Sequence, residues 1–171
     1  ILIWTVLPDR LRARTRPVAA AEYWNGSALR RFVGHKVFRA VPVDRRPEGR
    51  TDDPLQTILA ALEDDASLIL FPEGTRSPAD EGLQPFKSGL YNIAAARPDV
   101  ELVPVWIANL NRVMPRGRLI PVPQLCTVTF GAPIQLAAEE DRTAFLARAR
   151  ATLLNLAPDP DPDAALQEDP A

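Results

Sequence analysis

The stretch SLILFPEGTRS, residues Ser67–Ser77, decides how the rest of this 171-residue sequence is interpreted. Ser67–Phe71 is a short apolar run between structure breakers, which is typical of a strand buried on both faces. Pro72 has no N–H to donate and therefore ends ladder pairing. Ligands of open α/β sheets bind beyond the carboxyl ends of the strands. The residues that follow Pro72 are therefore candidates for a binding site: Glu73, Gly74, Thr75 and Arg76.

The chemistry of these residues favours an anion. Gly74 allows the backbone to turn sharply or to approach a ligand closely. Arg76 offers a planar guanidinium that suits phosphate or carboxylate. Glu73 can hold that guanidinium, or the N–H groups of its own turn. A plain surface turn with an ordinary Glu–Arg pair is the alternative interpretation.

A second segment adds to the predicted anion site. In QPFKSG, residues Gln84–Gly89, Lys87 and Ser88 open an apolar helical stretch. The first turn of a helix presents N–H groups and the positive end of the dipole, which also favour an anion. Together the two segments predict a phosphate pocket without the glycine loops of nucleotide-binding proteins.

Strand and helix patterns alternate along the chain, which predicts an α/β fold with a mostly parallel central sheet covered by helices. We expect a single domain over residues 1–157 and a disordered, acidic, proline-rich tail over 158–171. The expected strands are Arg16–Ala20, Ala40–Val43, Ser67–Phe71, Glu101–Ile107 and Leu125–Phe130. The expected helices are Glu22–Phe38, broken at Asn25–Ser27, then one that begins after Asp53, then Tyr91–Ala96 and Glu139–Leu156.

Charge is distributed unevenly. Residues 1–50 hold eleven arginines and lysines against four acids, although the net charge of the chain is −2. Arg10, Arg12, Arg14 and Arg16 form a row of alternates that predicts attraction to an anionic membrane surface or anionic substrates. Nucleic acid is not expected as a partner, because the cluster lacks interleaved aromatics or a recognisable reading motif. Trp and Phe side chains within 22–38 either cover the sheet or contact acyl chains or the membrane interface.

The sequence FPEGTRS followed by FKSG resembles the acceptor-binding motif of the glycerolipid acyltransferase family, whose best-known members are the lysophosphatidic acid acyltransferases. Three further segments are similar to this family: VPVDR at 41–45, the Val-Pro-Val within ELVPVWI, and GAPI at 131–134. The resemblance covers roughly residues 1–134.

The resemblance implies transfer of a fatty acyl group from acyl-CoA or acyl carrier protein to the free hydroxyl of 1-acylglycerol-3-phosphate, giving phosphatidic acid in phospholipid biosynthesis. It implies no metal and no redox cofactor, and a peripheral location on the cytoplasmic face of the membrane. The residues implied for the acceptor phosphate are Arg45, Gly74, Thr75, Arg76 and Lys87, with Glu73 and Ser88 shaping the site. Those implied for the acyl channel are Val103, Pro104 and Val105.

Two departures from the family pattern qualify this expectation. The family takes its catalytic base from an H-x4-D motif, whereas the only histidine, His35, is followed five residues later by Ala40. We expect the catalytic pair to lie upstream of Ile1 and this chain as given to be inactive, with His35 on a helix surface or strand edge. The family also commonly carries an Ala-Lys pair where this chain has Ala20-Ala21-Glu22.

Two alternatives therefore stay open. One is a non-catalytic lipid- or anion-binding domain of the same fold. The other is an acyltransferase that acts on a different lyso-lipid acceptor.

Overall fold

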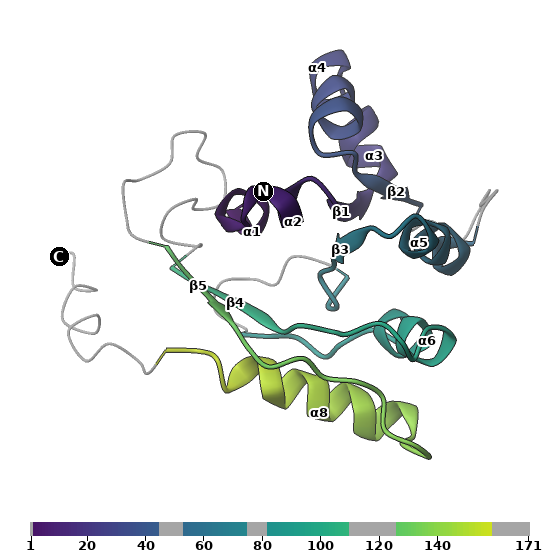
Figure 1. Ribbon diagram of the computed structural model, residues 1–171, viewed down its shortest axis with the longest axis vertical. Coiled ribbons are helices and arrows are strands. Elements are labelled where there is room, and N and C mark those ends of the chain that lie inside the picture. Colours follow the sequence, from purple (N-terminus) through teal and green to yellow (C-terminus); the bar gives the residue numbers. More distant parts are fainter. Residues whose placement is uncertain (1, 45–52, 75–81, 110–125, 159–171) are drawn as a thin grey trace, which may run out of the picture. The chain divides into compact units, whose positions relative to one another are not determined.

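The computed structural model describes residues 2–44, 53–74, 82–109 and 126–158. The chain divides into two compact units, Ile1–Arg76 with Phe86–Pro98, and Ser77–Pro85 with Asp99–Ala171. We call them the first and second units and describe each by itself (Figure 1). The expected limits of a domain at 1–157 and a tail at 158–171 stay a prediction, since 159–171 lie outside the described residues.

The first unit is built on a parallel sheet with strand order β2-β1-β3. Its strands are β1 (Thr15–Ala20), β2 (Val41–Val43) and β3 (Ser67–Ile69). In register, Val18 of β1 pairs with Val41 of β2, and Thr15 of β1 pairs with Ser67 of β3. The helical segments are α1 (Leu2–Val6), α2 (Asp9–Arg12), α3 (Ala21–Asn25), α4 (Ala28–Phe32), the π-helix η1 (Val33–Val37), α5 (Pro54–Glu63) and α6 (Gly89–Ala96). A parallel sheet flanked by helices confirms the expected α/β class.

Local sequence explains where these helices begin. The Asp53 carboxylate accepts a hydrogen bond from the Leu55 N–H, and Pro54 occupies the first turn, so α5 has both features of a strong N-terminus. Ser27 caps α4 by accepting from the Arg30 N–H, which explains the break expected at Asn25–Ser27. None of the described helices has the length and apolar character needed to span a bilayer.

The core of the first unit is aromatic where α3 and η1 meet the sheet. Trp24, Phe38 and Ala40 are buried together, with Trp4 packed against them. The Trp4 and Phe38 rings meet edge to face at 5.1 Å between centroids. Most of the aromatic side chains expected either on the sheet or at a membrane are therefore in the core; Phe32, with 60% of its surface exposed, is an exception.

The prediction for the strand Ser67–Phe71 is wrong in two respects. The strand ends at Ile69 and not at Phe71, and within the described residues it pairs with β1 alone. Leu68 and Ile69 are half-buried, and Phe71 exposes 58% of its surface. An apolar run shows that a segment is hydrophobic, but it does not show how many of its faces are covered.

The second unit pairs β4 (Val105–Ala108) with β5 (Thr127–Phe130) in an antiparallel ladder. The helix α8 (Arg142–Leu154) packs on β4, as Figure 1 shows, and buries Phe145 and Ala149. Its N-terminus is capped by Asp141, whose carboxylate accepts from the Thr143 and Ala144 N–H groups at 2.7 and 2.9 Å.

Candidate phosphate-binding site

The three parallel strands of the first unit bring their carboxyl ends to one edge of the sheet. Ala20 pairs with Val43, and Pro17 pairs with Ile69, so all three strands run in the same direction and end on the same side of the sheet. This is the edge at which open α/β sheets bind ligands. The segments that leave it are Ala21–Glu22, Asp44 and the FPEG turn.

The segment after β3 folds into a tight turn. The Gly74 N–H donates to the Phe71 carbonyl at 3.0 Å, which places Pro72 and Glu73 at the two central positions. Gly74 has a φ of 71°, a left-handed conformation that costs other residues roughly 1–2 kcal/mol. The sequence therefore needs glycine here for a backbone reason, whereas its contact with a ligand stays a prediction.

Lys87 is tied to this turn through the backbone. Its N–H donates to the Pro72 carbonyl at 2.8 Å. Its Cγ lies 3.3 Å from the place where a Cβ on Gly74 would stand, so the Lys87 stem runs past the turn. The two segments that the sequence assigned to one anion site are thus held together by a hydrogen bond. This brings together Glu73, Gly74, Lys87 and Ser88.

The beginning of α6 is open to solvent on this side. Lys87, Ser88 and Gly89 are exposed, and the Ser88 side chain makes no capping hydrogen bond to the helix. The Lys87 ammonium and the positive end of the α6 dipole therefore favour an anion from neighbouring positions. Glu73 and Gly74 are half-buried.

Three predicted phosphate ligands, Arg45, Thr75 and Arg76, lie outside the described residues. Asp44, the last described residue of the VPVDR segment, follows β2 at the same sheet edge as the FPEG turn. Arg45 follows Asp44, and Thr75 and Arg76 follow Gly74, in the sequence alone. Their roles stay predictions.

The predicted acyl-channel residues belong to the second unit and differ in exposure. Val103 exposes 46% of its surface, Val105 is half-buried, and Pro104 is buried. The Pro104 carbonyl accepts from the Gly131 N–H at 2.9 Å, just before β4 begins. A Cβ on Gly131 would lie 2.9 Å from Pro104 Cγ, so the glycine of the GAPI segment makes room for the proline. Of the three, Val103 presents the most apolar surface.

A sequence model of the acyltransferase family matches residues 1–108, which is more than half of the chain. The chain belongs to the acyltransferase family. The matched range contains every element of the first unit together with β4, and includes the FPEG turn and Lys87. The predicted resemblance to the glycerolipid acyltransferases is confirmed at the level of the family.

Curated relatives of this acyltransferase-family chain carry the name 1-acyl-sn-glycerol-3-phosphate acyltransferase. This chain is 38% identical over 77 residues to a chloroplastic enzyme of Brassica napus, and the match covers 45% of this chain and 22% of the relative. It is 36% identical over 77 residues to a chloroplastic enzyme of Arabidopsis thaliana, covering 45% and 21%. The match to a Chlamydomonas reinhardtii protein is 37% over 87 residues, covering 51% and 24%. The chain thus spans about a fifth to a quarter of the length of these relatives. No solved structure matches it.

The sequence around His35 does not match an H-x4-D motif. His35 is exposed on η1, as the sequence predicted for a helix-surface histidine, and Ala40 five residues later is buried. Ala40 has no carboxylate with which to orient an imidazole. That His35 is not the catalytic base stays a prediction.

The sequence patterns of this acyltransferase-family chain did not indicate that three arginines of the row Arg10–Arg16 make contacts within the protein. Arg12 pairs with Asp9, and Arg14 pairs with Asp65. The Arg16 guanidinium donates to the Arg39 carbonyl at 2.8 Å and lies 4.0 Å from Asp64. Three of the four cations predicted to attract a membrane therefore serve contacts within the first unit. The acids that engage Arg14 and Arg16 lie about 50 residues away, so no local pattern could have indicated the pairing.

Proposed function

We propose that this chain holds the phosphate of 1-acylglycerol-3-phosphate in an O-acyltransferase that transfers a fatty acyl group to the acceptor's free hydroxyl. The donor is acyl-CoA or acyl carrier protein, and the product is phosphatidic acid for phospholipid biosynthesis. The observation that carries the proposal is the hydrogen bond from the Lys87 N–H to the Pro72 carbonyl, which joins the Gly74 turn to the start of α6. Family membership and the names of the relatives support the same class of reaction.

A phosphate monoester suits this arrangement because it carries a charge of roughly −1.5 to −2 at neutral pH. Lys87 and the α6 N-terminus supply positive potential from the described residues. Arg45 and Arg76 supply guanidinium groups in the proposal, and Thr75 supplies a hydroxyl. Glu73 and Ser88 shape the turn and the helix start between them.

Acyl transfer from a thioester needs a base for the acceptor hydroxyl, a site that holds the acceptor and donors for the tetrahedral oxyanion. The thioester is already activated, so the proposal needs no metal or redox cofactor. This chain's share of the reaction is acceptor binding, because its only histidine lacks the carboxylate of an H-x4-D pair. Val103, Pro104 and Val105 border the acyl chain in this proposal.

We place the protein at the cytoplasmic face of the membrane as a peripheral protein, bound to anionic lipid and not to nucleic acid.

The absence of an H-x4-D sequence from the chain favours a second candidate, a non-catalytic domain that binds lysophospholipid or another anion. Such a domain uses the same Gly74 turn and Lys87. Binding measurements do not separate it from the enzyme, whereas transfer assays do.

Glu22 favours a different acceptor as a third possibility. It stands in the segment that follows Ala20, at the sheet edge where the family commonly has lysine. A carboxylate at this edge opposes binding of a dianionic phosphate. An acceptor with a zwitterionic head group is affected less.

The direct test is calorimetric titration of the chain with 1-hexanoylglycerol-3-phosphate, a short-chain acceptor that dissolves as monomers. We expect Lys87→Gln to raise the Kd about tenfold to a hundredfold, because a hydrogen bond to a charged group contributes about 1.5–3 kcal/mol. Arg142→Gln, which removes an exposed cation at the start of α8, is the matched control and leaves the Kd unchanged.

Two further ligands make the result specific. 1-Hexanoylglycerol, which lacks the phosphate, should bind equally to the wild type and to Lys87→Gln. A short-chain lysophosphatidylcholine that binds more tightly than the phosphate monoester identifies the third candidate. An unchanged Kd for the phosphate monoester in Lys87→Gln contradicts the proposed phosphate site.

A further inference from the structure

The continuous segment Ala28–Val37, formed by α4 and η1, leaves bulky apolar side chains on the outside of the first unit. Leu29 exposes 72% of its surface, Phe32 60% and Val37 46%. Leu29 is the most exposed of the large apolar residues in the described part of the chain. We call Leu29, Arg31, Phe32, His35, Lys36 and Val37 the α4–η1 face.

The inner side of the same segment is fixed against the core. Gly34 is buried so close to Trp24 that a Cβ would lie 2.7 Å from the indole ring. Val33 packs against the Trp24, Phe38 and Ala40 cluster, and the Phe38 N–H donates to the Val33 carbonyl at 3.1 Å, closing the π-helical turn. Gly34, the small residue of this segment, is therefore packed in the core, whereas Leu29 and Phe32 are exposed to solvent.

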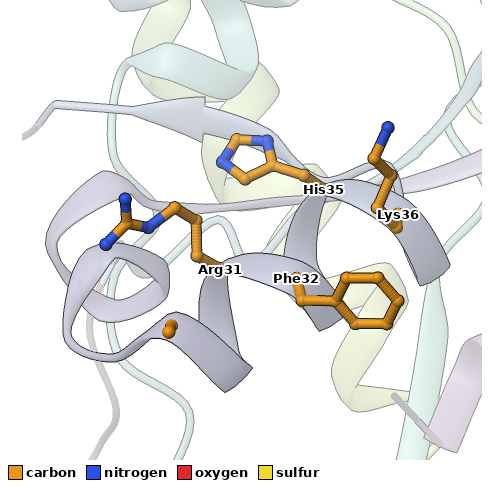
Figure 2. A pocket seen from close by; sticks show the side chains of 5 residues that line it. Arg31, Phe32, His35 and Lys36 are labelled. Carbon is orange, nitrogen blue, oxygen red and sulfur yellow. The ribbon is translucent and has the colours of Figure 1, made fainter.

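A groove of about 390 Å³ runs over this face. It is lined by Ala28, Arg31, Phe32, His35 and Lys36. Figure 2 shows Arg31 and His35 extending to one side of the helical segment, and Phe32 and Lys36 to the other. The side chains that line this groove thus include the apolar Phe32 as well as the cations Arg31 and Lys36.

The charge of the face is of one sign. No aspartate or glutamate occurs from Tyr23 to Val43. Within the described residues no ion pair joins Arg31 or Lys36 to an acid, in contrast to Arg12 and Arg14. Arg31 and Lys36 are therefore better placed to bind an external anion than the arginines of the predicted row Arg10–Arg16, most of which are engaged within the protein.

We propose that the α4–η1 face docks the protein on the surface of an anionic lipid bilayer. Leu29, Phe32 and Val37 enter the boundary between head groups and acyl chains, and Arg31 and Lys36 lie over lipid phosphates. Apolar side chains flanked by arginine and lysine are the combination by which amphipathic helices bind interfaces. Each cation near such a surface strengthens binding about fivefold. The inference rests on the proposed peripheral location at an anionic membrane and names the face that binds the membrane, which lies outside the proposed phosphate site.

Sedimentation of the 171-residue chain with vesicles tests this. The vesicles contain either phosphatidylcholine alone or phosphatidylcholine with 30 mol% phosphatidylglycerol, at roughly 0.1 M salt. We expect binding to the anionic vesicles, and weaker binding as salt increases. Leu29→Ser/Phe32→Ser should weaken it more than tenfold, and Arg31→Gln/Lys36→Gln about thirtyfold. Phe130→Ser, which removes an exposed phenylalanine of β5, is the matched control and keeps wild-type binding.

The same variants are titrated with 1-hexanoylglycerol-3-phosphate. Unchanged acceptor binding together with lost vesicle binding supports the proposal, and it also shows that the variants are folded. Wild-type protein that does not bind anionic vesicles while it binds the acceptor overturns this inference and the proposed peripheral location, and leaves the proposed acceptor binding intact. Vesicle binding that the two double variants do not weaken overturns it as well. The inference is also overturned if the chain does not bind vesicles but binds acidic acyl carrier protein, and if the two double variants weaken that binding.

Discussion

Gly34 is the residue that sets how closely the π-helix approaches the core. Its missing Cβ leaves room for the Trp24 ring, whose Cδ2 and Cε3 would otherwise lie 2.7 Å from a methyl group. Trp24 in turn lies 6.1 Å from Phe38, measured between ring centroids, and Phe38 meets Trp4. One glycine therefore supports the aromatic cluster on which α3, η1 and β2 rest.

Gly34→Ala should destabilise the protein by about 1–3 kcal/mol, the usual range when an added methyl group overpacks a core. The indole cannot move away without disturbing Phe38, so the cost is not relieved by a flexible neighbour. Chemical denaturation monitored by tryptophan fluorescence measures the change. Gly89→Ala is the matched control, because a Cβ there meets no atom within 4 Å and alanine suits the first turn of α6. Equal stability of the two variants would contradict the overpacking argument.

Residue-level reasoning from sequence succeeded at Gly74 and had no access to Gly34. A glycine after a strand and a proline is a turn signal, and the observed φ of 71° agrees with it. Gly34 has no such signature, because its necessity arises from Trp24, ten positions earlier and across a helix break. Lys87 was predicted to join the Gly74 turn, but the hydrogen bond to the Pro72 carbonyl could be known only from the structure.

At the scale of elements, the helices were predicted better than the pairing of the strands. α5 begins directly after Asp53, as expected, whereas α8 begins at Arg142, after its N-cap Asp141 and three residues later than the expected start at Glu139. The short apolar runs became β1 and β2 close to their expected limits. The expected strand at 67–71 is shorter and less buried, because pairing partners come from distant sequence and apolar continuity does not specify them. The π-helical turn at 33–37 was also not predictable, since it depends on the close contact of Gly34 with Trp24.

The pair Glu140–Arg148 joins α8 to the segment that precedes it. The Arg148 guanidinium donates to both Glu140 carboxylate oxygens at 2.8 and 2.7 Å, and to the Gln135 carbonyl at 2.8 Å. These hydrogen bonds from Arg148 are the main cause that lowers the pKa of Glu140 from 4.5 to about 2. A carboxylate whose pKa is lowered by folding stabilises the protein above its unfolded pKa, and this contribution disappears as pH falls through the folded value.

We therefore expect Glu140→Gln to lower the melting temperature at pH 7 and to have progressively less effect as pH falls from about 4.5 to about 2. Thermal unfolding of wild type and variant over this range, by circular dichroism, gives the two curves. Glu139→Gln, at the exposed neighbouring acid, should leave the pH dependence close to that of the wild type. Parallel curves for wild type and Glu140→Gln down to pH 2 would show that the pair does not stabilise the fold.

At the scale of the whole molecule, the described residues of the proposed phosphate site and the predicted acyl-channel residues belong to different compact units. The first unit joins the Gly74 turn to Lys87 and carries the exposed α4–η1 face. The second unit carries the predicted acyl-channel residues, of which Val103 is the most exposed. Sequence motifs predicted the family and the site segments because each motif is local. The assignment of these segments to two compact units depends on long-range contacts that no motif records.

By themselves, these 171 residues contain the proposed acceptor site but no H-x4-D sequence. They should bind 1-hexanoylglycerol-3-phosphate without transferring an acyl group from labelled acyl-CoA above the rate without protein, because His35 is exposed and has Ala40 where an H-x4-D pair has its carboxylate. His35→Ala should accordingly leave acceptor binding unchanged. Transfer assays run beside the binding titrations measure both properties on one preparation. Transfer by the 171 residues that His35→Ala abolishes would show that this histidine is a base after all, oriented by a group other than the one the motif requires.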